Sequence, residues 1–317
     1  MKKLLGIIIT AMLVVLAACG NKESSTTEDN GAKKETKPEM QTIAYLDKEY
    51  KLPANIKTIV TASQEAMEDA AVLGVKPAGA LATAGEFPAY LGDSMSEAQD
   101  IGDKFQPNTE KLLQIKPDII LGTSKFKPEV VKNLNKVATM IPVSHISVNW
   151  KENLLLMGNI TDKQAQAEEI IATYEKEAKE LKEKLSTKLS NQKVMMIRIR
   201  AGNIYIYPES IYFNPVFYQD LGLTVPNEIK AAKAQEMISL EKLAEINPDY
   251  IFVQFEKAEN PENENALKEY ENNAVWNSMK AVKNKKVYTN AIDPMAAGGT
   301  AWSKTNFLDV LQEKLGE

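Results

Sequence analysis

Short apolar runs alternate with amphipathic stretches along most of the chain after residue 40. The runs that fit strands are rich in aliphatic and β-branched residues, and they cover 58–61, 78–81, 119–121, 193–197, 251–253 and 286–288. Strands that alternate with helical segments are typical of α/β domains with mostly parallel sheets. The pattern predicts that fold class for the chain.

One long segment has a different pattern. From Asp162 to about Leu189 it is dense in Ala, Glu, Lys and Leu, with no glycine or proline after Asp162. This predicts a helix of roughly 25 residues, near 40 Å long at about 1.5 Å per residue. A coiled-coil partner is one interpretation. The single occurrence of the segment between two halves of the chain favours a rigid helix that joins them.

Two segments, 108–120 and 239–251, match each other along the chain. Each begins with a helix-capping residue, Asn108 or Ser239, and carries a glutamate in the first helical turn, where the helix dipole favours an anion. In each, the helix stops before a Pro-Asp pair that leads into an apolar strand, because a helix usually ends before proline. Two copies predict two similar lobes rather than a solenoid, which needs at least three repeats.

The N-terminus has the pattern of an export signal. Two lysines precede an apolar run, Leu4–Ala18, that is short for a membrane span of roughly 20 residues but suits a signal peptide. The run ends in Leu-Ala-Ala-Cys-Gly at 16–20, which resembles the lipobox of bacterial lipoproteins. That resemblance implies cleavage before Cys19 and attachment of lipids to it. An ordinary secretory signal that happens to contain a cysteine is the alternative.

The polar segment that follows Cys19 has almost nothing to bury and predicts a flexible tether. The complete predicted organisation has five parts. They are a signal peptide (1–18), the lipidated cysteine with its tether (19–40), a first α/β lobe (41–160), a connecting helix (161–190) and a second α/β lobe (191–317).

Arginine is almost absent from the chain. Of 38 basic residues only Arg198 and Arg200 are arginines, and they share one tripeptide at the end of a predicted strand. Residues at i and i+2 of a strand lie on one face, and paired guanidinium groups suit carboxylates and other oxygen-rich anions. The pair predicts an anion site. Chance adjacency in a lysine-biased sequence is the competing interpretation.

Composition excludes several kinds of chemistry. One cysteine and one histidine, His145, cannot build a Cys/His zinc site or an internal disulfide. The phosphate-binding motifs GxxxxGK[ST] and GxGxxG are absent, and a net charge of −5 argues against a nucleic-acid partner. We therefore expect no enzyme activity, no cofactor and no metal ligands from the protein. An exported hydrolase would need a nucleophile beside His145, which we expect in a loop or at a strand end.

Taken together, residues 41–317 resemble the helical-backbone class of ABC-transporter substrate-binding proteins, which capture ferric siderophores, haem or cobalamin. The motifs that carry the resemblance are Ile101-Gly102-Asp103, Glu110-Lys111-Leu112, Lys116-Pro117-Asp118, Val275-Trp276 and 279–288. The resemblance implies a ligand cleft between two lobes, with closure limited by the connecting helix. It also implies a monomer, anchored by lipid on the extracytoplasmic side of the cell membrane, that serves a permease with a separate ATPase.

The resemblance further implies roles for two glutamates. In this class a glutamate at the position of Glu110 and of Glu241, one on each lobe, faces arginines of the permease. Both residues equally fit a simpler role, since each complements a helix dipole for about 0.3–1 kcal/mol.

Ligands of open α/β sheets sit outside the carboxyl ends of the strands. On that rule the expected ligand-binding residues are Arg198, Arg200, Lys104, Lys125, Tyr205, Trp302 and Gln64, with Ser63 and Tyr207 close by in sequence. The expected ligand is a ferric siderophore of the citrate or hydroxamate-citrate type, whose chelator already fills the oxygen shell of the iron. Haem, with His145 or a methionine as axial ligand, is the alternative within the same fold.

Overall fold

The two repeated segments fold in the same way. In the computed structural model they form helices α2 (Thr109–Ile115) and α7 (Leu240–Ile246), and the capping side chains of Asn108 and Ser239 accept backbone hydrogen bonds as predicted. Both helices end in a left-handed residue, Lys116 at φ 53° and Asn247 at φ 49°, which closes the last turn.

The aspartate of each Pro-Asp pair ties its segment to a neighbouring strand. The Asp118 carboxylate accepts hydrogen bonds from the backbone N–H groups of Lys57 and Thr58, both at 2.8 Å. Asp249 accepts one from Lys193 at 2.9 Å. The repeat is therefore a structural device that sets the start of a central strand in each lobe.

The structure describes residues 39–83 and 85–316. The predicted signal peptide, Cys19 and nearly all of the predicted tether lie outside these residues. The described residues belong to one unit, Pro38–Glu317, in which the core is a single continuous hydrophobic cluster. Among the described helices, none is long and apolar enough to cross a membrane.

The first lobe is built on a five-stranded parallel sheet in the order β5-β4-β3-β6-β7. Its strands are β3 (Ile59–Ala62), β4 (Gly79–Ala80), β5 (Gln99–Asp100), β6 (Ile119–Thr123) and β7 (Met140–Val143). Helices α1 (Gln64–Val72), α3 (Pro128–Leu134) and α4 (Trp150–Ile160) accompany α2 in this lobe. An antiparallel hairpin, β1 (Met40–Tyr45) and β2 (Lys48–Pro53), precedes the sheet.

The second lobe has a mixed sheet in the order β10-β9-β8-β11-β12. Strands β8 (Val194–Arg200), β11 (Tyr250–Phe255) and β12 (Val287–Thr289) are parallel. Strand β9 (Asn203–Ile206) pairs antiparallel with both β8 and β10 (Glu236–Ile238). The predicted α/β class with mostly parallel strands is confirmed. The hairpin between β8 and β9 was not predicted. It is made by Ala201 and Gly202, whose positive φ values of 45° and 74° suit a two-residue turn.

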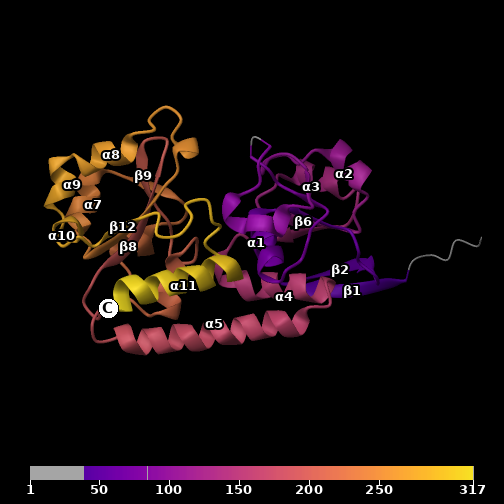
Figure 1. Ribbon diagram of the computed structural model, residues 1–317, viewed down its shortest axis with the longest axis horizontal. Coiled ribbons are helices and arrows are strands. Elements are labelled where there is room, and N and C mark those ends of the chain that lie inside the picture. Colours follow the sequence, from indigo (N-terminus) through magenta and orange to yellow (C-terminus); the bar gives the residue numbers. More distant parts are fainter. Residues whose placement is uncertain (1–38, 84, 317) are drawn as a thin grey trace, which may run out of the picture. The chain divides into compact units, whose positions relative to one another are not determined.

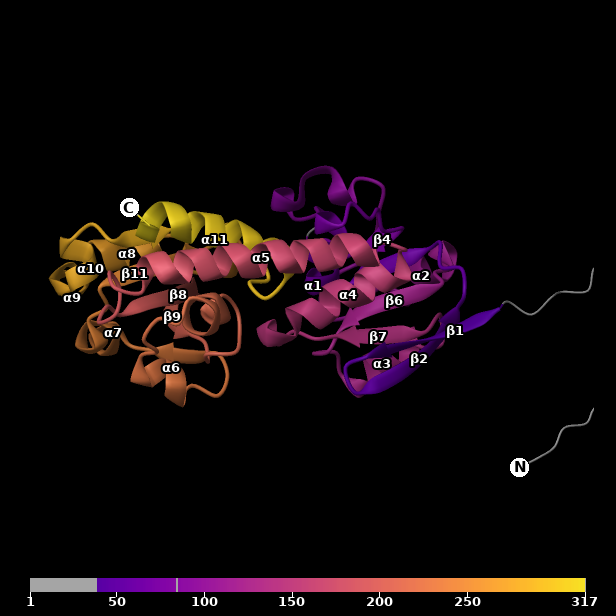
Figure 2. The ribbon, with the colours of Figure 1, turned by 90° about the horizontal axis from the view of Figure 1, so that it is seen from below.

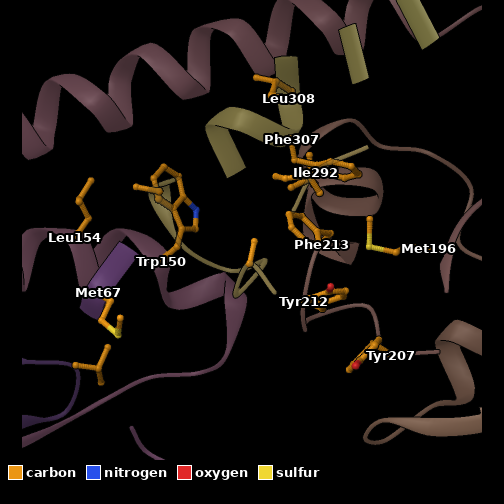
Figure 3. Packing of buried hydrophobic residues seen from close by; sticks show 14 of the residues in the cluster. Met67, Trp150, Leu154, Met196, Tyr207, Tyr212, Phe213, Ile292, Phe307 and Leu308 are labelled. Atoms are coloured by element: carbon orange, nitrogen blue, oxygen red, sulfur yellow. The ribbon is translucent and has the colours of Figure 1, made fainter. Parts of the chain in front are cut away.

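The remaining helices of this lobe are short, except the last. They are α6 (Asn227–Ala231), α8 (Ala266–Glu271), α9 (Ala274–Ser278), α10 (Lys280–Lys283) and α11 (Ala301–Gly316). Aromatic side chains pack α11 against the sheet: the ring of Phe307 lies 5.5 Å from that of Phe252 in β11. The ring of Phe213 lies 4.6 Å from that of Phe307, and Figure 3 shows both beside Ile292.

The connecting helix is α5 (Gln164–Leu185), which has 22 residues. It packs against α4 of the first lobe and α11 of the second (Figure 1, Figure 2). A buried polar cluster stabilises the packing of α5 against the second lobe. Lys304 of α11 and Tyr174 of α5 each contact the carboxylate of Asp220 at 2.6 Å, and Lys304 is 1% exposed.

Candidate functional site

A cavity of about 690 Å³ is lined by side chains from both lobes. The predicted ligand-binding residues that line it are Gln64, Lys104, Lys125, Arg198 and Arg200, together with Ser63 and Tyr207. The rule of strand ends explains this convergence, since α1 directly follows β3, Lys125 follows β6, and Arg200 is the last residue of β8.

Two predicted residues do not line the cavity. Trp302 falls in the first turn of α11, which begins at Ala301, and its ring packs on that of Tyr90 at 4.7 Å. Tyr205 lies within strand β9, opposite Arg198 in the ladder, and is absent from the lining.

Other aromatic side chains take their place. Tyr207 follows the end of β9, and its ring lies 4.8 Å from that of Tyr212 (Figure 3). Phe105 and Phe126 line the cavity from the first lobe. Phe105 is 74% exposed. The sequence could have indicated Phe105 as a lining residue, because it directly follows Lys104.

The two arginines are not equivalent. Arg198 is engaged within the protein: its Nε donates to Glu259 at 2.8 Å and its Nη1 to the Tyr212 hydroxyl at 3.1 Å. Arg200 contacts Glu259 at 3.3 Å and Gln235 at 3.1 Å. The side chain of Arg198 is 10% exposed and that of Arg200 is 34% exposed. Arg200 is thus the arginine more accessible to a ligand.

Glu259, which bridges both arginines, was missed by the sequence analysis. It lies on a short 3-10 helix, Lys257–Glu259, close after the carboxyl end of β11. The same rule that selected the cations could have found it. Its backbone carbonyl accepts from Ala201 at 2.9 Å, which ties this loop to the turn between β8 and β9.

The lysines of the first lobe that line the cavity interact electrostatically with the charged groups around them. Burial lowers the pKa of Lys104; the Glu259 carboxylate acts to raise that pKa, and Arg200 and Arg198 act to lower it. In the same lobe, burial raises the pKa of the Glu65 carboxyl, and Lys125 opposes that shift. Charges from the two lobes therefore act on one another across the cavity.

His145 also lines the cavity, just beyond β7. The Ser124 hydroxyl accepts from the His145 backbone N–H at 3.2 Å and lies 2.8 Å from ring Nδ1. Burial, with Lys125 as a second cause, lowers the pKa of His145.

The Ser124–His145 contact bears on the hydrolase alternative. It provides a hydroxyl beside the histidine, yet Ser124 is not among the residues that line the cavity. Within 39–83 and 85–316, no carboxylate hydrogen-bonds to the imidazole, so the third member of a triad is missing there. The same part of the chain contains no cluster of His, Cys, Asp and Glu that could hold a metal ion.

Glu110 and Glu241 occupy matching places away from the cavity. Each is exposed and lies in the first turn of its helix, α2 or α7. The local structure is the one that the repeat predicted, with both carboxylates near a helix N-terminus.

Comparison with known proteins gives consistent matches. Residues 59–291 match the model of a family described as periplasmic binding protein. The chain is 49% identical to the iron-uptake system-binding protein of Bacillus subtilis (strain 168), with 99% of each chain covered. It is 30% identical to a probable siderophore-binding lipoprotein, YfiY, of the same organism, with 89% of each covered.

A solved structure is similarly close. The crystal structure of the triscatecholate siderophore binding protein FeuA from Bacillus subtilis, complexed with ferri-bacillibactin, matches with a TM-score of 0.83. The two sequences are 51% identical, and the match covers 87% of this chain and 98% of the other.

Proposed function

The chain belongs to the periplasmic binding protein family, and from that premise we propose that it binds a ferric siderophore and delivers it to an ABC importer. The observation that carries the proposal is the charge of the cavity. Five cationic side chains line it, namely Lys104, Lys125, Lys127, Arg198 and Arg200. Convergent lysines and arginines at an open cavity favour an oxygen-rich anion over an uncharged ligand.

We propose a triscatecholate complex as the ligand, in place of the citrate or hydroxamate-citrate type expected from the sequence. The support comes from the 51% identical protein, whose crystal structure is described as a complex with ferri-bacillibactin. One ferric ion with three catecholate dianions is a trianion, which suits an excess of cationic side chains. Catecholate rings can also stack on cationic and aromatic groups, and Tyr207 and Phe105 line the same cavity.

We propose that Cys19 carries lipids that hold the protein at the extracytoplasmic face of the cell membrane. The lipobox-like sequence at 16–20 and the 30% identical relative named as a lipoprotein support this. We also propose that Glu110 and Glu241 dock the two lobes onto the importer's permease, while a separate ATPase drives transport. Their matching exposed positions on α2 and α7 support that role.

A titration of intrinsic fluorescence tests the ligand assignment. Ferri-bacillibactin is expected to quench the protein saturably with a Kd of about 1 μM or tighter, and at least about tenfold more tightly than ferric citrate or a ferric hydroxamate. A reversed order of affinities would restore the citrate or hydroxamate type. Haem serves as the control, because His145 lines the cavity. A haem absorption band that depends on His145 would favour the haem-binding alternative.

A further inference from the structure

Glu259 places a negative charge inside a cavity whose proposed ligand is an anion. Its carboxylate bridges Arg198 and Arg200, and its side chain is only 10% exposed. We infer that Glu259 is a built-in counter-anion, which competes with the ligand for Arg200 and thereby speeds the ligand's release. This inference rests on the proposed function.

The two ion pairs of Glu259 differ, and the difference would allow a ligand to displace one of them. The contact with Arg198 is short, 2.8 Å, and both partners are buried. The contact with Arg200 is longer, 3.3 Å, and Arg200 is the accessible partner. A bound anion would therefore take donors from Arg200, while Glu259 keeps its contact with Arg198. When the anion leaves, the Glu259–Arg200 contact forms again.

The backbone around Glu259 prevents the carboxylate from simply moving away. Its carbonyl oxygen accepts from Ala201 at 2.9 Å. The next residue, Asn260, is buried and donates to the Ile199 carbonyl at 3.0 Å, and it accepts from Gly202 at 3.0 Å. These bonds fix the segment to the strand that carries both arginines. The negative charge consequently stays in the cavity when an anion binds.

A fixed like charge beside a bound trianion raises the free energy of the complex, because the two repel each other in a partly desolvated site. Affinity changes within one binding site act mainly through the dissociation rate. Removal of the charge should therefore slow dissociation. If Glu259 served only to position the arginines, its loss would instead loosen them and speed dissociation. The two roles predict opposite signs.

The test uses Glu259→Gln, which keeps the shape and removes the charge, and Glu262→Gln, an exposed neighbour in sequence, as the matched control. The full chain is loaded with ferri-bacillibactin, and dissociation is followed by fluorescence recovery after an excess of the gallium(III) complex is added. Glu259→Gln is expected to slow dissociation about tenfold at low salt, and less at about 1 M salt, where the Debye length is ~3 Å. Glu262→Gln is expected to dissociate like the wild type.

A second variant separates charge from shape. Glu259→Asp keeps the negative charge but shortens the side chain, so it should slow dissociation much less than Glu259→Gln does. Equal slowing in Glu259→Asp and Glu259→Gln would overturn the inference, as would an unchanged or faster rate in Glu259→Gln. A wild-type protein that none of the tested ferric siderophores quenches would instead refute the proposed function itself.

Discussion

Glu68 of α1 accepts a hydrogen bond from Ser303 of α11 at 2.5 Å, and this contact joins the two lobes. The same buried carboxylate accepts from Thr300, from the Ala297 backbone and from the Tyr90 hydroxyl. Three of its four donors lie at or just before the N-terminus of α11, where the helix dipole favours an anion. Glu68 therefore fastens α11, the last helix of the second lobe, to the first lobe.

Replacement of Glu68 should destabilise the whole unit. Glu68→Ala leaves several buried donors without an acceptor, so the free energy of unfolding is expected to fall by about 3 kcal/mol or more. Glu68→Gln, which retains one carbonyl oxygen, should lose less. Urea unfolding measures both, with Glu129→Ala at an exposed position of α3 as control. A loss below about 1 kcal/mol for Glu68→Ala would contradict the role of this contact.

The carboxyl group of Asp69, the next residue of α1, should make the free energy of unfolding depend on pH. Burial raises its pKa well above the ordinary value, and the neighbouring charges of Glu68 and Glu65 raise it further. The folded protein thus binds this proton more tightly than the unfolded chain. The contribution of Asp69 to the free energy of unfolding is fully present below the ordinary pKa of aspartate. It is lost as the pH rises through the raised pKa of the folded state.

Asp69→Asn mimics the protonated form and should remove that loss. At about pH 8 the variant is expected to unfold with a free energy higher than that of the wild type by about 1 kcal/mol or more, and the difference should shrink toward about pH 5. Urea titrations at several pH values provide the measurement. A difference that stays constant with pH would show that Asp69 is not the titrating group.

Local signals account for the parts of the fold that the sequence predicted. Asn108 and Ser239 cap their helices because side chain and recipient N–H lie within three residues of each other. The contact between Glu68 and Ser303 spans 235 residues, and no local pattern encodes it. The β8–β9 hairpin was also missed, because its turn is Ala201-Gly202 rather than the more usual Asn-Gly or Asp-Gly.

The same distinction applies to the candidate site: strand ends predicted part of it, and long-range contacts determine the rest. Strand ends brought Arg198, Arg200 and Lys125 to one cavity, since the direction of a parallel strand can be inferred from sequence. The pairing of both arginines with Glu259 depends on how the segment after β11 folds back onto β8, which the sequence alone does not specify. Trp302 was misplaced because the start of α11 could not be fixed to the residue.

The unequal exposure of the two arginines predicts unequal effects. Arg200→Ala should weaken binding of ferri-bacillibactin at least about tenfold, with little change in stability. Arg198→Ala should also lower the free energy of unfolding by about 3 kcal/mol, because it leaves the buried Glu259 carboxylate without its close partner. Fluorescence titration and urea unfolding separate the two effects. Arg200→Lys, which keeps the positive charge but lacks the bidentate guanidinium group, is the matched control.

This assignment would fail in either of two ways. Undiminished affinity in Arg200→Ala would exclude that side chain as a ligand contact. Wild-type stability in Arg198→Ala would show that the Arg198–Glu259 pair does not support the fold.

The proposed docking of the two lobes can be tested by charge reversal. Glu110→Lys and Glu241→Lys should leave ligand affinity unchanged, since both residues lie outside the cavity lining, and should abolish uptake of radiolabelled iron by cells that depend on this protein. Glu129→Lys, exposed on α3, controls for surface charge. Normal uptake with either docking variant would reject that glutamate as a docking residue.

His145 predicts that ligand binding takes up a proton. Burial and the charge of Lys125 lower its pKa, so the ring is neutral near pH 7. A bound trianion would offset the charge of Lys125 and raise that pKa. Because the complex then binds a proton more tightly than the free protein, affinity for ferri-bacillibactin should rise as pH falls from about 8 toward 6.

Titration calorimetry in two buffers with different ionisation enthalpies measures that proton uptake directly. The wild type should take up a fraction of a proton per ligand near pH 6.5, the ordinary pKa of histidine. His145→Gln, which retains a donor and cannot become charged, should bind with no such uptake and with a flatter pH dependence. Protonation of the siderophore itself is common to both proteins and cancels in their difference. Equal uptake by wild type and variant would therefore assign the proton to the ligand or to another residue of the cavity.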